Sequence, residues 1–459
     1  MMKPSDIFTP MMIKELRQEL RSKFILRLFF WSQLSLVLVY ALYLMAEAKM
    51  RSTQLVFSLI VGLQLIVMGI LLPGRGWQGF IREERSNSLE LLTLTKLSGI
   101  RIVLGKWLAI VALTTLYCMS LLPHLVFAYF LARLNVVNLF SNTALIFLTS
   151  IGLSAFTLTG SAFQKGKTSV MLSAGFAVLF AFLLASTSRL FAYSGGIGKG
   201  IDFIDFLVLL SYVTLTALEL FLVAAARIGP VYENYSAAKR LTALLVLALT
   251  WLLFALGFGN TMLIAACSTV FLALFAIGTS FENLHPLIPM RVQHKTITPW
   301  LTYSGWPQAF VCTLLLFIGQ GVLFKVYKLT NCEHPALAAA FICAGIILPR
   351  ITCLLVPRTL GNSPLAYLIL FTAFGVLSAV FESLRLPISR GTISGLAERL
   401  PSIFPLSVGI AMFSRPYFGL KYDLTVTGTV LVVEVLLLLY LFRRDKRQLF
   451  HEHGQFNRE

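Results

Sequence analysis

The chain has 459 residues, of which 57% are apolar and only 13% charged, and its mean hydropathy is +0.82. Water-soluble domains carry about 25% charged and roughly 45–50% apolar residues, so this composition excludes a soluble enzyme, a secreted disulfide scaffold and a disordered tail. The apolar residues form uninterrupted runs that reach the roughly 20 residues needed to cross a bilayer as a helix. The sequence therefore predicts an all-α, polytopic membrane protein.

The net charge of +18 is carried mostly by the gaps between the apolar runs. This is the distribution that the positive-inside rule gives a membrane protein, so we expect no nucleic-acid partner. The six cysteines include no CxxC pair and lie near no cluster of histidines. We therefore expect them to be packing residues and expect no metal site.

Residues 1–27 are predicted to form a cytoplasmic amphipathic helix, over 9–27, that lies on the inner face of the membrane and contacts lipid. Thr9 is a suitable N-cap and Pro10 suits the first helical position. Apolar side chains recur from Met12 to Phe24 at a spacing of four, with basic residues between them. A basic stretch that only sets the topology is the alternative. The candidate site residues of this helix are Lys14, Glu15, Leu16 and Arg17.

About twelve runs are long and apolar enough to be spanning helices. They are 28–46, 54–72, 108–131, 139–162, 169–188, 206–226, 241–257, 261–281, 308–324, 336–356, 364–384 and 424–442. With the N-terminus in the cytoplasm, 26 of the 38 Lys and Arg fall on the inner side and 12 on the outer side. This bias places both termini in the cytoplasm, and it favours twelve spans over eleven or thirteen because an odd number would put the basic tail, 443–459, outside.

The loop at 75–106 is the most specific segment of the sequence. It carries six Lys and Arg, and Asn87 followed by Glu90 resembles a capping box that starts a short leucine-rich helix. A loop built of short helices with a mixed apolar and charged surface is suited to docking against a soluble cytoplasmic partner.

A charged amphipathic helix, two spanning helices and then "EERSNSLELLTLTKLSGIRIVLGK" resemble the permease subunit of ABC-2 type transporters. The sequence departs from the family pattern at two positions. Ser88 stands where Gly-Thr is usual, and Lys96 replaces a usual Pro. The matching residues are Glu84, Arg85, Ser88, Leu89, Glu90, Leu91, Leu92, Thr95, Leu97, Ser98, Gly105 and Lys106.

The resemblance covers about residues 5–230. It implies a six-helix permease unit, 28–230, whose elbow helix and coupling loop, 75–106, face a separate ABC ATPase subunit, most simply a dimer. The candidate docking residues are Glu83, Glu84, Arg85, Glu90, Leu91, Leu92, Thr95, Ser98, Gly105 and Lys106. Residues 231–442 are either a diverged second permease unit or an appended membrane domain. If they are not a second unit, two copies of the chain should form a homodimer.

The chain carries no P-loop of its own. The nearest sequence, from Gly195 to Gly200, has Gly200 where Ser or Thr must bind magnesium. We therefore expect no cofactor on this chain, no enzymatic activity, and ATP and magnesium on the partner ATPase.

Glu219 and Glu434 are predicted to be intramembrane polar sites, since a membrane carboxylate is costly and should face the bundle interior, a cavity or a partner. The functional interpretation is a substrate or ion pathway. A neutral interhelical contact is the alternative. His124, which follows Pro123 in the third span, is expected to be a packed histidine.

The resemblance implies a permease of the inner, cytoplasmic membrane that moves a substrate, with export the expected direction. One rival is a membrane enzyme acting on a lipid-linked substrate, for which the outer loop 385–423 is the only place to look. The other is a scaffold that uses the ATPase for mechanical work.

Overall fold

The computed structural model describes residues 10–45, 53–81, 98–132, 136–163, 203–229, 235–280, 305–327 and 432–441, together with the single residues 83, 343, 345, 346, 351, 370 and 443. The contacts divide the chain into two units, Met1–Glu233 and Asn234–Glu459, and this division lies close to the predicted boundary after residue 230. Each unit is described by itself.

Seven of the described helices are long and apolar enough to cross a membrane, as is typical of a helical membrane protein. These seven correspond to predicted spans, and α12 and the apolar helix Val432–Leu441 fall within two others. The predicted spans 169–188, 336–356 and 364–384 lie outside the described residues apart from a few isolated positions.

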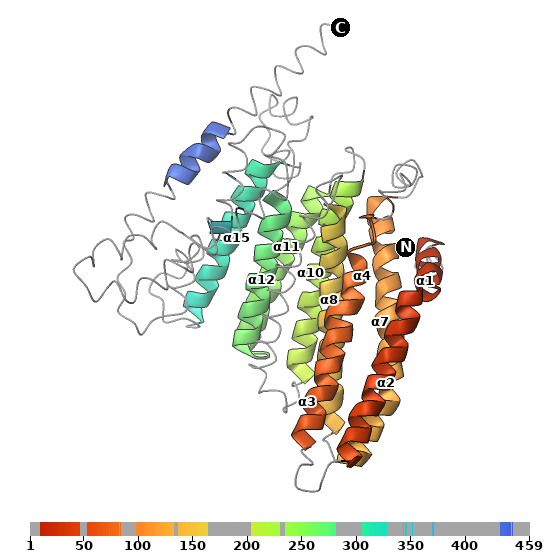
Figure 1. The fold of residues 1–459 in the computed structure, drawn as a ribbon. Coiled ribbons are helices and arrows are strands. Elements are labelled where there is room, and N and C mark those ends of the chain that lie inside the picture. Colours follow the sequence, from red (N-terminus) through yellow and green to blue (C-terminus); the bar gives the residue numbers. More distant parts are fainter. Residues whose placement is uncertain are drawn as a thin grey trace, which may run out of the picture. The chain divides into compact units, whose positions relative to one another are not determined.

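Unit 1 contains a short helix followed by long apolar ones (Figure 1). The described elements are α1 (Pro10–Leu20), α2 (Lys23–Met45), α3 (Thr53–Gln64), the π-helix η2 (Leu65–Leu71), α4 (Leu72–Gly76), α7 (Gly99–Ala132), α8 (Val136–Ala162) and α10 (Phe203–Ile228). α8 is central among them, because it packs against α10, α7, η2 and α4.

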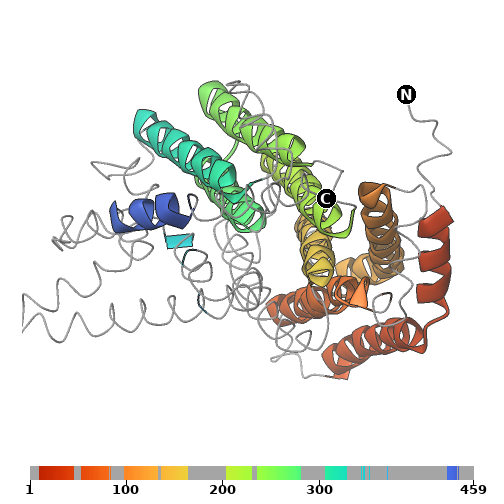
Figure 2. The ribbon, with the colours of Figure 1, turned by 90° about the horizontal axis from the view of Figure 1, so that it is seen from above.

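The prediction of one continuous helix over 9–27 is wrong. α1 ends at Leu20 and α2 begins at Lys23, because Ser22 interrupts the helix and its Oγ accepts a hydrogen bond from Ile25 N–H at 3.3 Å. This is the way that Ser caps the start of a helix. Seen from above, α1 lies lengthwise at the edge of unit 1 (Figure 2), so it crosses the direction of the spanning helices and does not continue α2.

The predicted coupling loop, 75–106, is helical at both of its ends. The second span continues through η2 and α4 to Gly76, and α7 already begins at Gly99. α7 has 34 residues and at 1.5 Å per residue is about 51 Å long, which exceeds the roughly 30 Å hydrocarbon core. Its first two turns therefore extend beyond the apolar run from which the span was predicted.

α8 and α10 run in the same direction. A Cβ added to Gly152 of α8 would lie 3.5 Å from Val213 of α10, and further along α8 the Thr159 hydroxyl donates to Leu220 O at 3.0 Å. Two parallel helices that follow each other in the chain need a crossing between them. The predicted span 169–188, which lies outside the described residues, is the expected crossing.

Unit 2 contains α11 (Ser236–Leu256), α12 (Thr261–Ser280) and α15 (Trp306–Val326). α11 ends at Gly257 in the left-handed conformation, with φ +65°, which is a usual helix terminator. α12 and α15 are joined by Gln320 Nε2, which donates to Ser268 Oγ at 2.8 Å and to Thr269 Oγ1 at 3.0 Å. The three helices pack on one another.

Candidate functional site

Lys106, in α7, joins three segments of unit 1 beside the predicted coupling loop. Its Nζ lies 2.9 Å from Glu15 Oε1 on α1 and 2.8 Å from Glu83 Oε1, although the two carboxylates come from distant parts of the sequence. The Lys106 side chain is only 3% exposed. The contact therefore fixes Glu83, the last described residue before 84–97, to α7 and, through Lys106, to α1.

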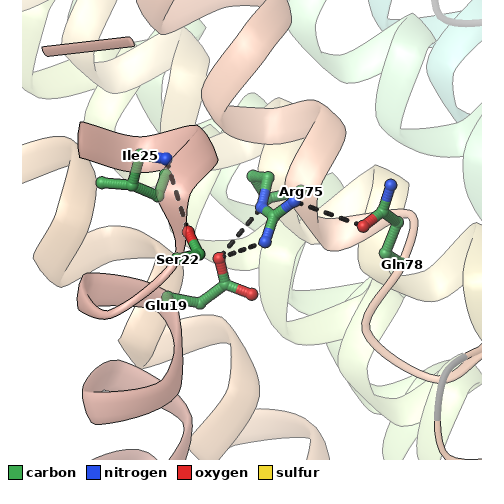
Figure 3. A network of polar contacts seen from close by, with 5 residues as sticks. All are labelled: Glu19, Ser22, Ile25, Arg75 and Gln78. Carbon is green, nitrogen blue, oxygen red and sulfur yellow. Dashed lines mark hydrogen bonds and ion pairs between the residues drawn. The ribbon is translucent and has the colours of Figure 1, made fainter. Parts of the chain in front are cut away.

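A second ion pair fixes the other half of α1. Arg75, in α4, contacts Glu19 Oε2 through Nε at 2.9 Å and Nη2 at 2.5 Å (Figure 3). Its Nη1 donates to Gln78 Oε1 at 3.2 Å, and its guanidinium lies over the Phe24 ring at 5.0 Å. With three kinds of contact the Arg75 side chain is held in one orientation. We call Glu15, Glu19, Arg75, Glu83 and Lys106 the ionic cluster.

α1 turns an acidic face toward the rest of unit 1. Glu15 and Glu19 are four residues apart and therefore share a face of the helix, and Met11 on the same side is buried, at 7% exposure. Because the partners of both acids lie on α4 and α7, charge pairing as well as apolar packing fixes how α1 is rotated.

The predicted apolar stripe of α1 does not all face one way. Leu16 is half-buried, whereas Leu20 is 42% exposed and Ile13 is 50% exposed. Lys14 and Arg17 are exposed as well. α1 thus has an inward acidic face, an outward apolar face and a basic edge, and the last two suit the membrane surface on which such helices lie.

Close backbone packing holds α4 against α8. A Cβ on Gly76 would lie 2.6 Å from Thr157 Oγ1 and 3.2 Å from Leu158 N, so only glycine fits without a shift. The Thr157 hydroxyl also donates to Pro73 O at 2.6 Å. The helix turn that carries Arg75 is therefore seated directly on α8.

The start of α7 is seated on the end of α10. A Cβ on Gly99 would lie 3.0 Å from Ala225 O, and Ser98 O accepts the N–H groups of Arg101 at 3.0 Å and Ile102 at 3.4 Å. The described parts of the chain on either side of residues 84–97 are thus fixed by backbone contacts as well as by charge.

The structure brings together three of the predicted site residues, Glu15, Glu83 and Lys106. Gly105 is buried beside Lys106, and Ser98 immediately precedes α7. The remaining predicted docking residues lie outside the described residues, namely Glu84, Arg85, Glu90, Leu91, Leu92 and Thr95.

Sequence reasoning missed Glu19 and Arg75. The signal for Glu19 was its spacing of four from Glu15 on a helix whose other polar residues are mostly basic. For Arg75 the signal was its place at the end of an apolar run beside two glycines. Neither signal identifies the partner, because the pair is separated by 56 residues.

The two predicted membrane acids are both buried. Glu219 lies on α10 and is 2% exposed, and Glu434 lies in the helix Val432–Leu441 and is 3% exposed. They belong to different units. His124, on α7, stacks on Tyr40 with ring centroids 6.0 Å apart, and its carbonyl accepts the Tyr40 hydroxyl at 2.8 Å, so it packs as expected.

The residues of the ionic cluster form ion pairs that hold four segments of unit 1 together. Within the residues that the structure describes, no group of three His, Cys, Asp or Glu is placed to hold a metal ion. Charge-assisted hydrogen bonds of this length are strong and directional, so a displacement of one segment acts on the others.

A scan against protein-family models finds no match to the chain, and comparisons with curated proteins and with solved structures find none either. The resemblance to ABC-2 permeases therefore depends on the residues of the coupling loop and the elbow helix.

Proposed function

We propose that the chain is the membrane-spanning permease subunit of an ATP-binding-cassette transporter. ATP and magnesium bind to a separate ATPase subunit, which docks on the coupling loop from the cytoplasm. The observation that supports this proposal is Lys106, which holds Glu83 at 2.8 Å and Glu15 at 2.9 Å. The segment with the family motif begins beside this lysine, at Glu83.

The arrangement suits the transfer of a movement from the loop to the helices. A partner that pulls on residues 84–97 acts on Glu83 at one end and on α7 at the other. Both ends meet at Lys106, and α1 is attached to the same lysine. Because packed helices respond to such a load as rigid bodies, α1, α4 and α7 would move together.

The rest of the proposal follows from the sequence. The chain lies in the inner, cytoplasmic membrane with both termini in the cytoplasm, and export is the expected direction of transport. The ATPase acts as a dimer, which meets either the two units of one chain or two copies of the chain. A membrane enzyme remains the rival, but its candidate loop, 385–423, lies outside the described residues.

Co-purification tests the proposal. The tagged chain is extracted gently from its native host, and bound proteins are identified by mass spectrometry. We expect an ABC ATPase with the wild-type chain, and we expect it to be lost with the double variant Glu84→Ala and Arg85→Ala. Glu83 is left intact, because its removal would disturb the buried contact with Lys106 and confuse loss of docking with loss of folding.

Lys325→Ala is the matched control. Lys325 is exposed at the end of α15 and lies on the predicted outer side, so this variant should retain the ATPase. Size-exclusion profiles establish that all variants are folded. Absence of an ATPase from the wild-type sample, under conditions that preserve a known ABC complex, would overturn the proposal.

A further inference from the structure

The charged residues of α1 and of the start of α2 are separated by sign. Both acids, Glu15 and Glu19, face the rest of unit 1, where they pair with Lys106 and Arg75. The basic residues are all exposed, and within the described part of the chain their side chains make no ion pair or hydrogen bond. They are Lys14, Arg17, Arg21, Lys23 and Arg27. The outer surface of this segment therefore carries five positive charges that no described residue neutralises.

Helix geometry gathers the cations of α1 on one edge. At about 100° per residue, Lys14, Arg17 and Arg21 fall within about 60° of one another. Arg21 still follows the helix, because its N–H donates to Arg17 O at 3.3 Å. The exposed side chains of Ile13 and Leu20 point about 80° to one side of these cations. α1 thus presents a basic edge beside an exposed apolar edge, as does a helix at the boundary between lipid headgroups and acyl chains.

The outward face of α2 continues this surface into a membrane span. Lys23 and Arg27 lie one turn apart at its start. Phe30 and Leu34 follow on the same face at helical spacing and are 63% and 45% exposed. α1 and α2 both lie at the edge of unit 1 (Figure 2). Because α2 is long and apolar enough to cross a membrane, we expect this apolar face to contact acyl chains and the two cations before it to lie among the headgroups of the same lipids.

A layer of anionic headgroups is the partner that fits this surface. Its charges are uniformly positive, and its exposed apolar side chains are continuous with the outward face of a spanning helix. A soluble acidic partner would match the charges but not a surface that runs into the membrane. Several basic residues beside a spanning helix, or on an amphipathic one, are the usual recognition feature for anionic phospholipids.

We propose that Lys14, Arg17, Arg21, Lys23 and Arg27, which we call the basic surface, bind the headgroups of anionic phospholipids in preference to zwitterionic ones. Any spanning helix contacts lipid, and selection by headgroup charge is what the separated charges of α1 and α2 add. Because α1 is attached to α4 and α7 through its acids, lipid bound to the basic surface also holds the ionic cluster at the membrane. The proposal requires that α2 spans the membrane and does not depend on an ATPase.

Native mass spectrometry tests the selection. The purified full chain is incubated in detergent with equal amounts of phosphatidylglycerol and phosphatidylcholine, and the lipids that stay bound are counted. We expect an excess of phosphatidylglycerol on the wild-type chain, and a ratio at least fivefold smaller on the triple variant Lys14→Gln, Arg17→Gln and Arg21→Gln. A single basic residue near an anionic surface changes affinity about fivefold. Lys23 and Arg27 are left in place, because they help to set the orientation of α2.

The matched control removes three positive charges from three other places. Arg101→Gln, Lys325→Gln and Arg443→Gln are combined, since all three residues are exposed, and this variant should change the lipid ratio less than twofold. Equal losses in the two triple variants would overturn the proposal, because the preference would then follow the net charge of the protein. An unchanged ratio in the α1 variant would overturn it as well, and would leave these residues to set the topology or to bind a soluble partner.

A photoreactive phosphatidylglycerol locates the bound lipid on the wild-type chain and keeps the test informative if the α1 variant does not fold. Cross-links are mapped by mass spectrometry, and we expect them in residues 10–31, with at least fivefold fewer from the phosphatidylcholine analogue. Raising the salt concentration from about 0.05 M to about 0.5 M should reduce them, because salt screens exposed charges. Cross-links only elsewhere, or cross-links in 10–31 that salt does not affect, would overturn the proposal. No ATPase enters these measurements, so the basic surface can fail while the proposed function stands, and the reverse.

Discussion

The Lys106 side chain is almost completely buried, and its positive charge is balanced by the carboxylates of Glu15 and Glu83 from two other segments. Such a contact contributes little net stability relative to apolar residues, since desolvation offsets most of the attraction. Its removal is costly, however, because the partners stay behind as buried charges. The cluster therefore specifies which segments meet more than it stabilises the fold.

Lys106→Met is expected to destabilise unit 1 by about 3–5 kcal/mol, the usual cost of removing one partner from a buried pair. The triple variant Lys106→Met, Glu15→Gln and Glu83→Gln should recover most of this loss, since no unpaired charge remains. Thermal unfolding of the purified protein measures both. Lys14→Met is the control, because Lys14 also lies on α1 but is exposed, and surface changes usually stay within about 0.5 kcal/mol.

A triple variant no more stable than the single one would contradict this account. It would mean that the Met side chain, and not the stranded carboxylates, causes the loss.

Among residues, the sequence analysis named three members of the ionic cluster, Glu15, Glu83 and Lys106, but did not predict that they contact one another. Glu19 and Arg75 were not predicted because a contact across 56 residues depends on how α1 is placed in the assembled unit, where it packs mainly on α7. Hydropathy and spacing report local preferences, and this contact is a property of the assembled bundle.

At the scale of elements, the spans were predictable because an apolar run has one stable place in a membrane protein. The ends of the helices were not. Hydropathy marks only the part of α7 that lies in hydrocarbon, so residues 99–107, which are helical, were assigned to a loop. The π-helix has no signature in its sequence, LIVMGIL, since its wider turn is selected by packing against α8.

The close contact between α4 and α8 can be tested with a matched pair of glycine variants. Gly76→Ala places a methyl group 2.6 Å from Thr157 Oγ1 and 3.2 Å from two backbone atoms of α8, and overpacking of this kind costs about 1–3 kcal/mol. Gly74→Ala, two residues earlier on the same helix, meets nothing within 4 Å and should be neutral or stabilising by up to about 1 kcal/mol.

The unfolding temperatures of the two glycine variants check this prediction. Because α4 carries Arg75, the proposed function also predicts that Gly76→Ala weakens recovery of the proposed ATPase in co-purification. Equal behaviour of the two variants would show that the close approach of α4 to α8 is not required.

At the scale of the whole molecule, unit 1 begins and ends on the same side. α1 contacts α7, the start of α7 contacts Ala225 near the end of α10, and α10 is parallel to α8. A chain that returns to its starting side crosses an even number of times. The five described crossings, α2, α3 to α4, α7, α8 and α10, therefore agree with six only if the predicted span 169–188 crosses as well.

Reporter fusions test this parity in both units. A fluorescent protein that folds only in the cytoplasm should be fluorescent when fused after residue 230 and after residue 459, and a phosphatase active only outside should be active when fused at residue 195 and at residue 400. A dark fusion after residue 230 would remove the crossing at 169–188 and with it the six-helix permease unit. A fluorescent fusion at 230 with a dark one at 459 would leave unit 1 intact and give residues 231–442 an odd number of spans. That result would exclude a second permease unit of six helices, and the proposed ATPase dimer would then have to meet two copies of the chain.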